Sequence, residues 1–214
     1  AFAAAIQTVS SLGGGTIYIP SGVYPSRSIE LLSHTALYLE AGAIIRFLDT
    51  IESYDLIETE SEGRPVLCYK PLIFADHAED IAIRGQGTLD GNGGVWGKAQ
   101  HSRTLTHGRP PMLHFQYCQH ICLEDITILR SPFWTVHPDS PNTDGIDPAS
   151  TRNLRIVDCT IDVGDDCIAI KSGTEEISSP LPSENITITG CTMLHGHGGV
   201  VLGSEMSGGI RNVV

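Results

Sequence analysis

The sequence predicts an all-β chain folded as a right-handed parallel β-helix, a solenoid, with a short N-terminal helix as its cap. Three observations predict this fold. Short runs rich in β-branched residues recur between turn signals along most of the 214 residues. Several of these runs begin alike, with an aspartate, asparagine or histidine, at a recurring spacing. The composition, with 23 Gly and 12 Pro, suits one ordered domain with many turns.

The first expected element is a helix over residues 2–12. Its residues Phe2, Ile6, Val9 and Leu12 are spaced as one apolar helical stripe, and three glycines follow where a helix would end. At the open end of a solenoid, such a helix covers strand edges that would otherwise stay unpaired. We therefore expect it to cap the stack.

Strand-like segments follow the helix. They occupy residues 15–20, 35–45, 80–91, 120–130, 153–161 and 185–193. Similar units begin at Asp80, His120, Asn153, Asn185 and Asn212, at intervals of 40, 33, 32 and 27 residues. Repeats of this length indicate units that bury their apolar faces on each other, so the residues at the unit starts should form a ladder. The larger intervals hold either a long loop or a second, poorly marked coil.

An antiparallel β-sandwich is the competing fold. Its tight hairpins favour Asn-Gly or Asp-Gly turns, and such pairs are few here, as at Asp90-Gly91 and Asp144-Gly145. We expect a single β-helix domain over residues 1–214, which lacks one coil near residues 138–139 and ends before its last coils.

Charge and composition exclude several classes of protein. The formal net charge is −12, and such an acidic surface repels nucleic acid. No apolar run approaches the roughly 20 residues that a membrane span needs. The 6 cysteines are too sparse for a disulfide scaffold and lack a CxxC spacing, so we expect buried free thiols and no metal site.

Three glycine-rich polar segments, residues 141–148, 164–173 and 195–209, interrupt the strands. The second contains Asp165 and Asp166, which can share a site only if the chain bends there, as Gly164 allows. Asp144 lies about one short coil earlier, so stacking would bring its carboxylate near Asp165. Crowded carboxylates raise one another's pKa, which can leave one protonated beside ionised ones, as glycoside hydrolysis requires. A calcium site or a solvated acidic face is the alternative interpretation.

A histidine is expected to join these acids. His197 lies between Gly196 and Gly198, which allow close approach, and it follows Asp165 by about one repeat. His195 is its nearest alternative. The sequence therefore favours Asp144, Asp165, Asp166 and His197 as a catalytic group on one exterior face.

These segments together resemble the polygalacturonase family of glycoside hydrolases, family 28, in its bacterial form. The resemblance is carried by Asn142-Thr143-Asp144, by Asp165-Asp166 and by Gly196-His197-Gly198. Segments such as GGGTIYIPSGVY and GTLDGNGGVW extend it over nearly the whole chain. It implies hydrolysis of α-1,4 galacturonosyl linkages in pectin or polygalacturonate, with inversion and without a cofactor.

The resemblance also implies a role for each residue. Asp165 would be the general acid, Asp144 and Asp166 would activate the attacking water, and His197 would support the acid. Asn142 and the nearby cation Lys171 are expected to bind substrate. The family's RxK motif does not occur before Val214, so we expect this chain to be nearly inactive.

Several alternatives stay open. The segment HGGVVLGSEMSGG is similar to exo-acting bacterial members, which favours exo over endo attack. A calcium-dependent pectate lyase and a non-catalytic β-helix that binds carbohydrate, such as an adhesin, are the competing functions. A pectin substrate favours a secreted or periplasmic location.

Overall fold

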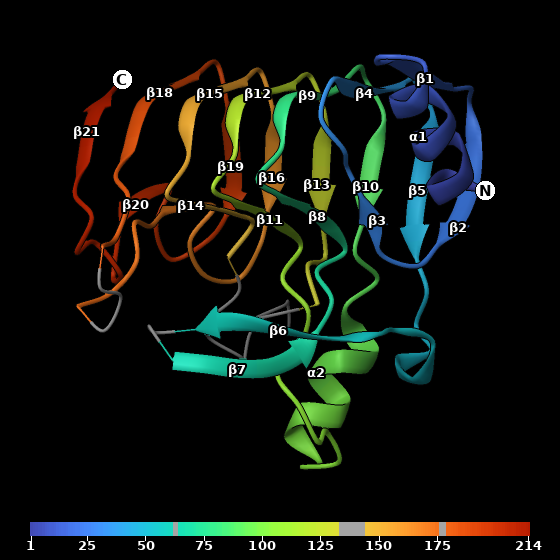
Figure 1. Ribbon diagram of the computed structural model, residues 1–214. Coiled ribbons are helices and arrows are strands. Elements are labelled where there is room, and N and C mark those ends of the chain that lie inside the picture. Colours follow the sequence, from blue (N-terminus) through green and yellow to red (C-terminus); the bar gives the residue numbers. More distant parts are fainter. Residues whose placement is uncertain (62–63, 133–143, 176–178) are drawn as a thin grey trace.

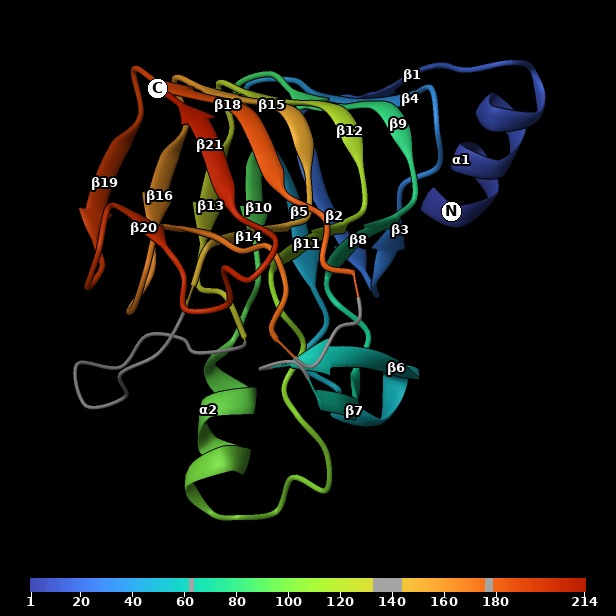
Figure 2. The ribbon, with the colours of Figure 1, turned by 60° about the vertical axis from the view of Figure 1, so that its left-hand side comes forward.

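The computed structural model describes residues 1–61, 64–132, 144–175 and 179–214. Three parallel sheets run side by side along the molecule, and each turn of the chain adds one strand to each of them in order (Figures 1 and 2). The expected parallel β-helix is confirmed, and the antiparallel sandwich is excluded because every neighbouring pair in these three sheets is parallel.

The strands of the three sheets have the following bounds. Sheet A contains β1 (Gly15–Ile19), β4 (Thr35–Leu39), β9 (Glu79–Arg84), β12 (Gln119–Glu124), β15 (Arg152–Val157), β18 (Ser183–Thr189) and β21 (Ile210–Val213). Sheet B contains β2 (Gly22–Ser26), β5 (Ala43–Phe47), β10 (Thr88–Asp90), β13 (Thr127–Leu129), β16 (Thr160–Asp162) and β19 (Thr192–His195). Sheet C contains β3 (Ile29–Glu30), β8 (Ile73–Asp76), β11 (Leu113–Gln116), β14 (Ile146–Ala149), β17 (Ile168–Ile170) and β20 (Val200–Leu202).

The N-terminal helix α1 (Phe2–Ser11) lies against the first coil, beside β1 (Figure 2). Ile6 is buried in the common core, whereas Leu12, which the apolar stripe included, is 79% exposed beyond the end of the helix. The predicted helix and its capping position are confirmed, but the helix ends at Ser11, one residue before the predicted end.

Polar residues at the start of successive strands of sheet A form the expected ladder. Asp80 Oδ1 lies 3.0 Å from His120 Nδ1, and the Asn185 side chain donates a 3.0 Å hydrogen bond to Asn153. Asn212 donates in the same way to Asn185, also at 3.0 Å. All five residues have positive φ angles, between 55° and 59°. Asn, Asp and His tolerate this left-handed conformation better than most residues, which explains why they recur at this position.

The two longest repeats carry outgrowths and not extra coils. Between β5 and β8 the chain forms the short 3₁₀ helix η1 (Ile51–Ser53) and the antiparallel pair β6 (Leu56–Ser61) and β7 (Arg64–Tyr69). Between β10 and β11 it forms α2 (Gly94–His101), whose buried Trp96 contacts the rings of Tyr54 and Tyr69. Both outgrowths leave the corner between sheets B and C and project to the same side (Figures 1 and 2).

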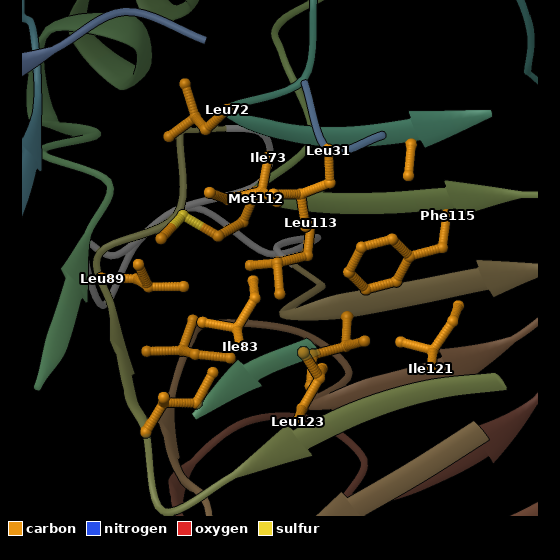
Figure 3. Close-up of a cluster of buried hydrophobic side chains, with 14 of the residues drawn as sticks. Leu31, Leu72, Ile73, Ile83, Leu89, Met112, Leu113, Phe115, Ile121 and Leu123 are labelled. Atoms are coloured by element: carbon orange, nitrogen blue, oxygen red, sulfur yellow. The ribbon is translucent and has the colours of Figure 1, made fainter. Parts of the chain in front are cut away.

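Apolar side chains from all three sheets fill the interior. Figure 3 shows Leu113 and Phe115 of β11 facing Ile121 and Leu123 of β12 across this core, and all four are at most 2% exposed. Each coil buries its apolar face on the next, so the stack depends on contacts between neighbouring coils.

A buried carboxylate holds three coils together at the corner between sheets B and C. Asp90, 2% exposed, accepts a 2.9 Å hydrogen bond from Arg46 Nε and a 2.8 Å bond from Arg130 Nε. Burial alone would raise the pKa of the Asp90 carboxyl, but these hydrogen bonds hold it below its usual value. The group is therefore a paired, ionised carboxylate.

The cysteines and the helices match two further expectations. All 6 cysteines are free thiols, and all except the half-buried Cys191 are buried. Among the described residues no helix combines the length and the apolar character that crossing a membrane requires.

Candidate active site

The three predicted acids and His197 meet at the corner between sheets B and C. Asp165 and Asp166 lie in the turn that joins β16 to β17, and Asp144 directly precedes β14 on the coil before. His197 lies in the turn between β19 and β20, one coil further on. The chain bends at the acid pair, as sharing one site requires, because β16 ends at Asp162 and β17 starts only at Ile168.

Backbone hydrogen bonds stack the three turns directly on one another. Gly145 N–H donates to the carbonyl of Asp166 at 2.9 Å, and His197 N–H donates to the carbonyl of Asp165 at 2.6 Å. Glycine suits this spacing, because a Cβ on Gly196, whose φ is 153°, would lie 2.8 Å from the backbone carbonyl oxygen of Asp165. The glycines around His197 therefore permit close approach, as the sequence indicated.

His197 belongs to the acid pair and His195 does not. His197 Nδ1 lies 3.4 Å from Asp165 Oδ1, and their side chains are 88% and 18% exposed. His195 is in β19 and its Nδ1 lies 2.8 Å from Asp162 Oδ1 on sheet B. An exposed imidazole beside a shielded carboxylate can exchange protons with solvent while it orients that carboxylate.

Asp144 is held from two sides. Its Oδ1 accepts a 3.3 Å hydrogen bond from the Asp166 backbone N–H, and its Oδ2 lies 3.8 Å from Lys171 Nζ. Lys171 also lies 3.9 Å from Glu205 Oε2, and its side chain is 22% exposed. The cation that was expected to bind substrate is therefore engaged by two carboxylates of the protein itself.

Crowding shifts the protonation of this group. Burial raises the pKa of Asp166, and the charges of Asp144 and Asp165 raise it further. Burial alone would lower the pKa of the Lys171 ammonium, but the surrounding carboxylates outweigh burial and raise it. Asp166 therefore holds its proton more tightly than an isolated aspartate does, a property that general acid and base catalysis uses.

Two members of the cluster escaped the sequence analysis. Asp147 in β14 is 6% exposed, and burial together with the charge of Asp144 raises its pKa well above the usual value. Glu205 follows β20 and completes the surroundings of Lys171. Both lie in the polar segments that the sequence singled out, but only the stacking of coils shows that they approach Lys171.

Some predicted features lie outside the described residues. Asn142, the second expected substrate contact, is one of them, and so is the point near residues 138–139 where a coil is expected to be missing.

A cation could also approach these groups. Single ligand atoms of Asp165, Asp166 and His197 lie within 4.8 Å of one another. Calcium prefers six to eight oxygen ligands, whereas this set offers two carboxylates and an imidazole nitrogen. The donor set is therefore a poor match for the calcium that a lyase would use.

Comparisons with known proteins show what this chain is similar to. The sequence profile described as "Glycosyl hydrolases family 28" matches residues 41–214. A protein from Vitis vinifera named "Probable polygalacturonase" is 36% identical over all of this chain, which covers 49% of that relative. An "Endo-polygalacturonase" from Pectobacterium carotovorum subsp. carotovorum is 27% identical over 88% of this chain and 53% of the relative.

Solved structures show the same fold. A hyperthermoactive exopolygalacturonase from Thermotoga maritima matches all of this chain with a TM-score of 0.78 and 31% identity, and the chain covers 60% of that structure. Such neighbours confirm the right-handed parallel β-helix. The chain spans about half the length of these two curated relatives.

Proposed function

Because the chain belongs to glycoside hydrolase family 28, we propose that it hydrolyses α-1,4 linkages between galacturonate units of pectin or polygalacturonate. One observation carries the proposal: Asp144, Asp165 and His197 come from three consecutive coils and converge, with Asp166, on one corner of the solenoid. A group of carboxylates with divided protonation is the equipment that glycoside hydrolysis uses.

The roles follow from the contacts. Asp165 is the general acid, because His197 lies beside it at 3.4 Å and can restore its proton from solvent. Asp144 is the base that activates water, because its carboxylate is oriented by the Asp166 N–H at 3.3 Å and by the Lys171 ammonium at 3.8 Å. Burial and the charges of Asp144 and Asp165 raise the pKa of Asp166, so Asp166 holds a proton more readily than an isolated aspartate.

Inversion is proposed on the arrangement of these acids. An inverting enzyme needs about 6.5–9.5 Å between its acid and its base so that a water fits between them. Oxygens of Asp165 and Asp166 approach within 4.8 Å, which leaves little room for that water. We propose Asp144, on the neighbouring coil, as the carboxylate that faces Asp165 across the attacking water.

Substrate binding is the weakest part of this site. Lys171 and Asn142 are the proposed contacts to substrate, but Lys171 is already engaged by Asp144 and Glu205. Arg211 forms a 2.6 Å ion pair with Glu184. With these cations occupied and a net charge of −12, we expect the 214-residue chain to turn over a polyanionic substrate slowly.

We further propose exo attack. The β6–β7 hairpin and α2 both rise from the corner between sheets B and C, on the coils that precede Asp144 (Figures 1 and 2). A chain of sugars that lies along this corner would meet them on one side of the acids. Exo attack predicts that the smallest product dominates from the start while viscosity falls slowly. An early mixture of long oligomers with a rapid loss of viscosity would indicate endo attack.

The experiment that tests the function compares three proteins on polygalacturonate: the wild-type chain, Asp165→Asn and Asp162→Asn. Reducing ends and the ultraviolet absorbance of unsaturated products are both recorded. We expect reducing ends without new absorbance, and a loss of about 10²–10⁴-fold in turnover for Asp165→Asn, the range that a general acid contributes. Asp162→Asn is the matched control, because Asp162 lies on the same coil but pairs with His195.

Other results would point to the competing functions. New absorbance that disappears with a chelator and returns with calcium would support the pectate lyase. Retention of polysaccharide with no release of reducing ends would support a carbohydrate-binding or adhesin domain. Near-normal turnover by Asp165→Asn would contradict the assignment of the acid.

A further inference from the structure

Asp147 occupies an unusual place on sheet C. Its neighbour Ile146 points into the apolar core, so Asp147 points to the outer face of the sheet. Outward residues are normally solvated, yet Asp147 is only 6% exposed. Oδ1 of Asp147 has no hydrogen-bond partner within the part of the chain that the structure describes. A buried carboxylate with an unpaired oxygen is unfavourable in its charged form.

The charges around Asp147 make its ionisation still less favourable. Asp144 precedes it in the chain, Glu205 approaches from the loop after β20, and Lys171 approaches from the end of β17. His114 of β11 is its neighbour in the strand register, and burial lowers the pKa of that imidazole, which keeps it neutral. One ammonium therefore faces several carboxylates.

Among these carboxyls, Asp147 is best suited to keep a proton. The side chains of Asp144 and Glu205 are 14% and 18% exposed and lie within 4 Å of the Lys171 ammonium. Asp147 is more deeply buried, and the nearby charge of Asp144 raises its pKa further. Two neighbouring carboxyl groups can share a hydrogen bond only when one of them carries the proton.

We propose that Asp147 is a neutral carboxylic acid that donates its proton in a hydrogen bond to Asp144 and thereby fixes the orientation of the ionised Asp144. Asp144 is then held by three positive partners: the Asp147 O–H, the Asp166 N–H at 3.3 Å and the Lys171 ammonium at 3.8 Å. Asp147 is a positioning residue, because it acts through Asp144. Its role in catalysis rests on the proposed hydrolysis, but its protonation does not.

Carboxyl-carbon NMR of protein labelled at the aspartate carboxyl carbon tests the protonation without any substrate. We expect one aspartate signal to stay at the protonated position near pH 7 and to disappear in Asp147→Asn. Asp76→Asn is the matched control, because Asp76 lies on the same face of sheet C but is 45% exposed and pairs with His77. An Asp147 signal that titrates in the ordinary range near pH 4 would overturn the proposal.

Activity provides the second readout. Asparagine keeps the size of Asp147 and a neutral donor, so Asp147→Asn should keep turnover within about threefold of wild type. Asp147→Leu keeps the volume but removes the donor, so turnover should fall by about 10–100-fold. This loss should not exceed the loss that follows removal of the base itself. The acidic limb of the pH–rate profile of Asp147→Leu should also move to higher pH, because the carboxylate of Asp144 loses a hydrogen-bond donor.

The outcomes separate the two proposals. If Asp147→Asn is as inactive as Asp144→Asn, the charge of Asp147 is needed and the inference is wrong. If the wild-type chain hydrolyses no galacturonan but the NMR signal behaves as expected, the proposed function fails and the neutral acid stands. The asparagine variant and the NMR measurement remain decisive even if Asp147→Leu does not fold.

Discussion

An alanine in place of Gly198 would press directly on the acid pair. Its Cβ would lie 2.7 Å from Asp166 Oδ1, roughly 0.7 Å inside an ordinary contact, and it would also meet Val201 Cγ2. Val201 has little rotational freedom because it is β-branched, so the added methyl group displaces Val201 and Asp166 together. The substitution therefore moves Asp166 by a good part of an ångström.

The size of the effect follows from this geometry. A misplacement of about 1 Å at a reacting group can reduce turnover by about 10²-fold, so we expect Gly198→Ala to lower kcat by about 10–100-fold. Overpacking typically destabilises a protein by about 1–3 kcal/mol. For a domain of this size, that corresponds to a fall of about 2–12 °C in Tm.

The neighbouring glycine provides the control. A Cβ on Gly199 would have Met193 Cγ as its nearest neighbour at 4.0 Å, an ordinary contact, so Gly199→Ala should keep both kcat and Tm close to wild type. Initial rates of reducing-end release and thermal unfolding measure the two quantities for both variants. Equal kcat values for Gly198→Ala and Gly199→Ala would refute the claim that the packing of Gly198 positions Asp166.

Three further predictions concern stability and thiol reactivity. Asp90→Asn should destabilise the fold by about 2–3 kcal/mol at pH 7, as measured by urea unfolding. The control Glu124→Gln, at a more exposed ion pair, should destabilise it by less than about 1 kcal/mol. Because the folded pKa of Asp90 is lowered, its contribution is complete above the unfolded pKa near 4 and is lost as the pH falls through the folded value, so the difference from wild type should shrink in acid. Ile156→Ala should leave a cavity in the core and lower the unfolding free energy by about 2–5 kcal/mol, and a loss below 1 kcal/mol would contradict the packing described. A hydrogen bond from Cys159 lowers the pKa of the Cys191 thiol, and Cys191 is half-buried whereas the other five cysteines are buried, so peptide mapping after brief alkylation at pH 7 should find Cys191 modified before any other cysteine.

The sequence predicted the coils wherever a local rule was strong. His120 and Asn153 could be identified as repeat starts because a left-handed backbone position selects for a few residue types. Most strands of sheets A and B lie in or next to the predicted segments and carry alternating β-branched side chains, whereas β2 (Gly22–Ser26) was not predicted.

Sheet C was not predicted because its sequence breaks the usual signals. β14 contains Pro148, which normally argues against a strand, and its outward residue Asp147 is buried by the site. The helix α2 contains two glycines, which disfavour helices, and it is stabilised by the burial of Trp96. In each case tertiary contacts outweigh local preference.

The candidate site, too, could be predicted only in part from the sequence. Asp144, Asp165, Asp166 and His197 could be named from motifs and from the repeat length. The ion pair between Lys171 and Glu205 could not, because the two residues meet only through the stacking of β17 and β20. For the same reason, the sequence could assign Lys171 to substrate but could not show that the protein's own carboxylates engage it.

The stereochemistry of the first product tests the central claim most directly. Proton NMR can follow short galacturonan oligomers during hydrolysis and distinguish the two anomers before they interconvert in water. If Asp165 protonates the leaving oxygen while Asp144 activates a water from the opposite side, the α linkage must give the β anomer first. Early accumulation of the α anomer would contradict the account, because it would require a covalent intermediate at one of these acids.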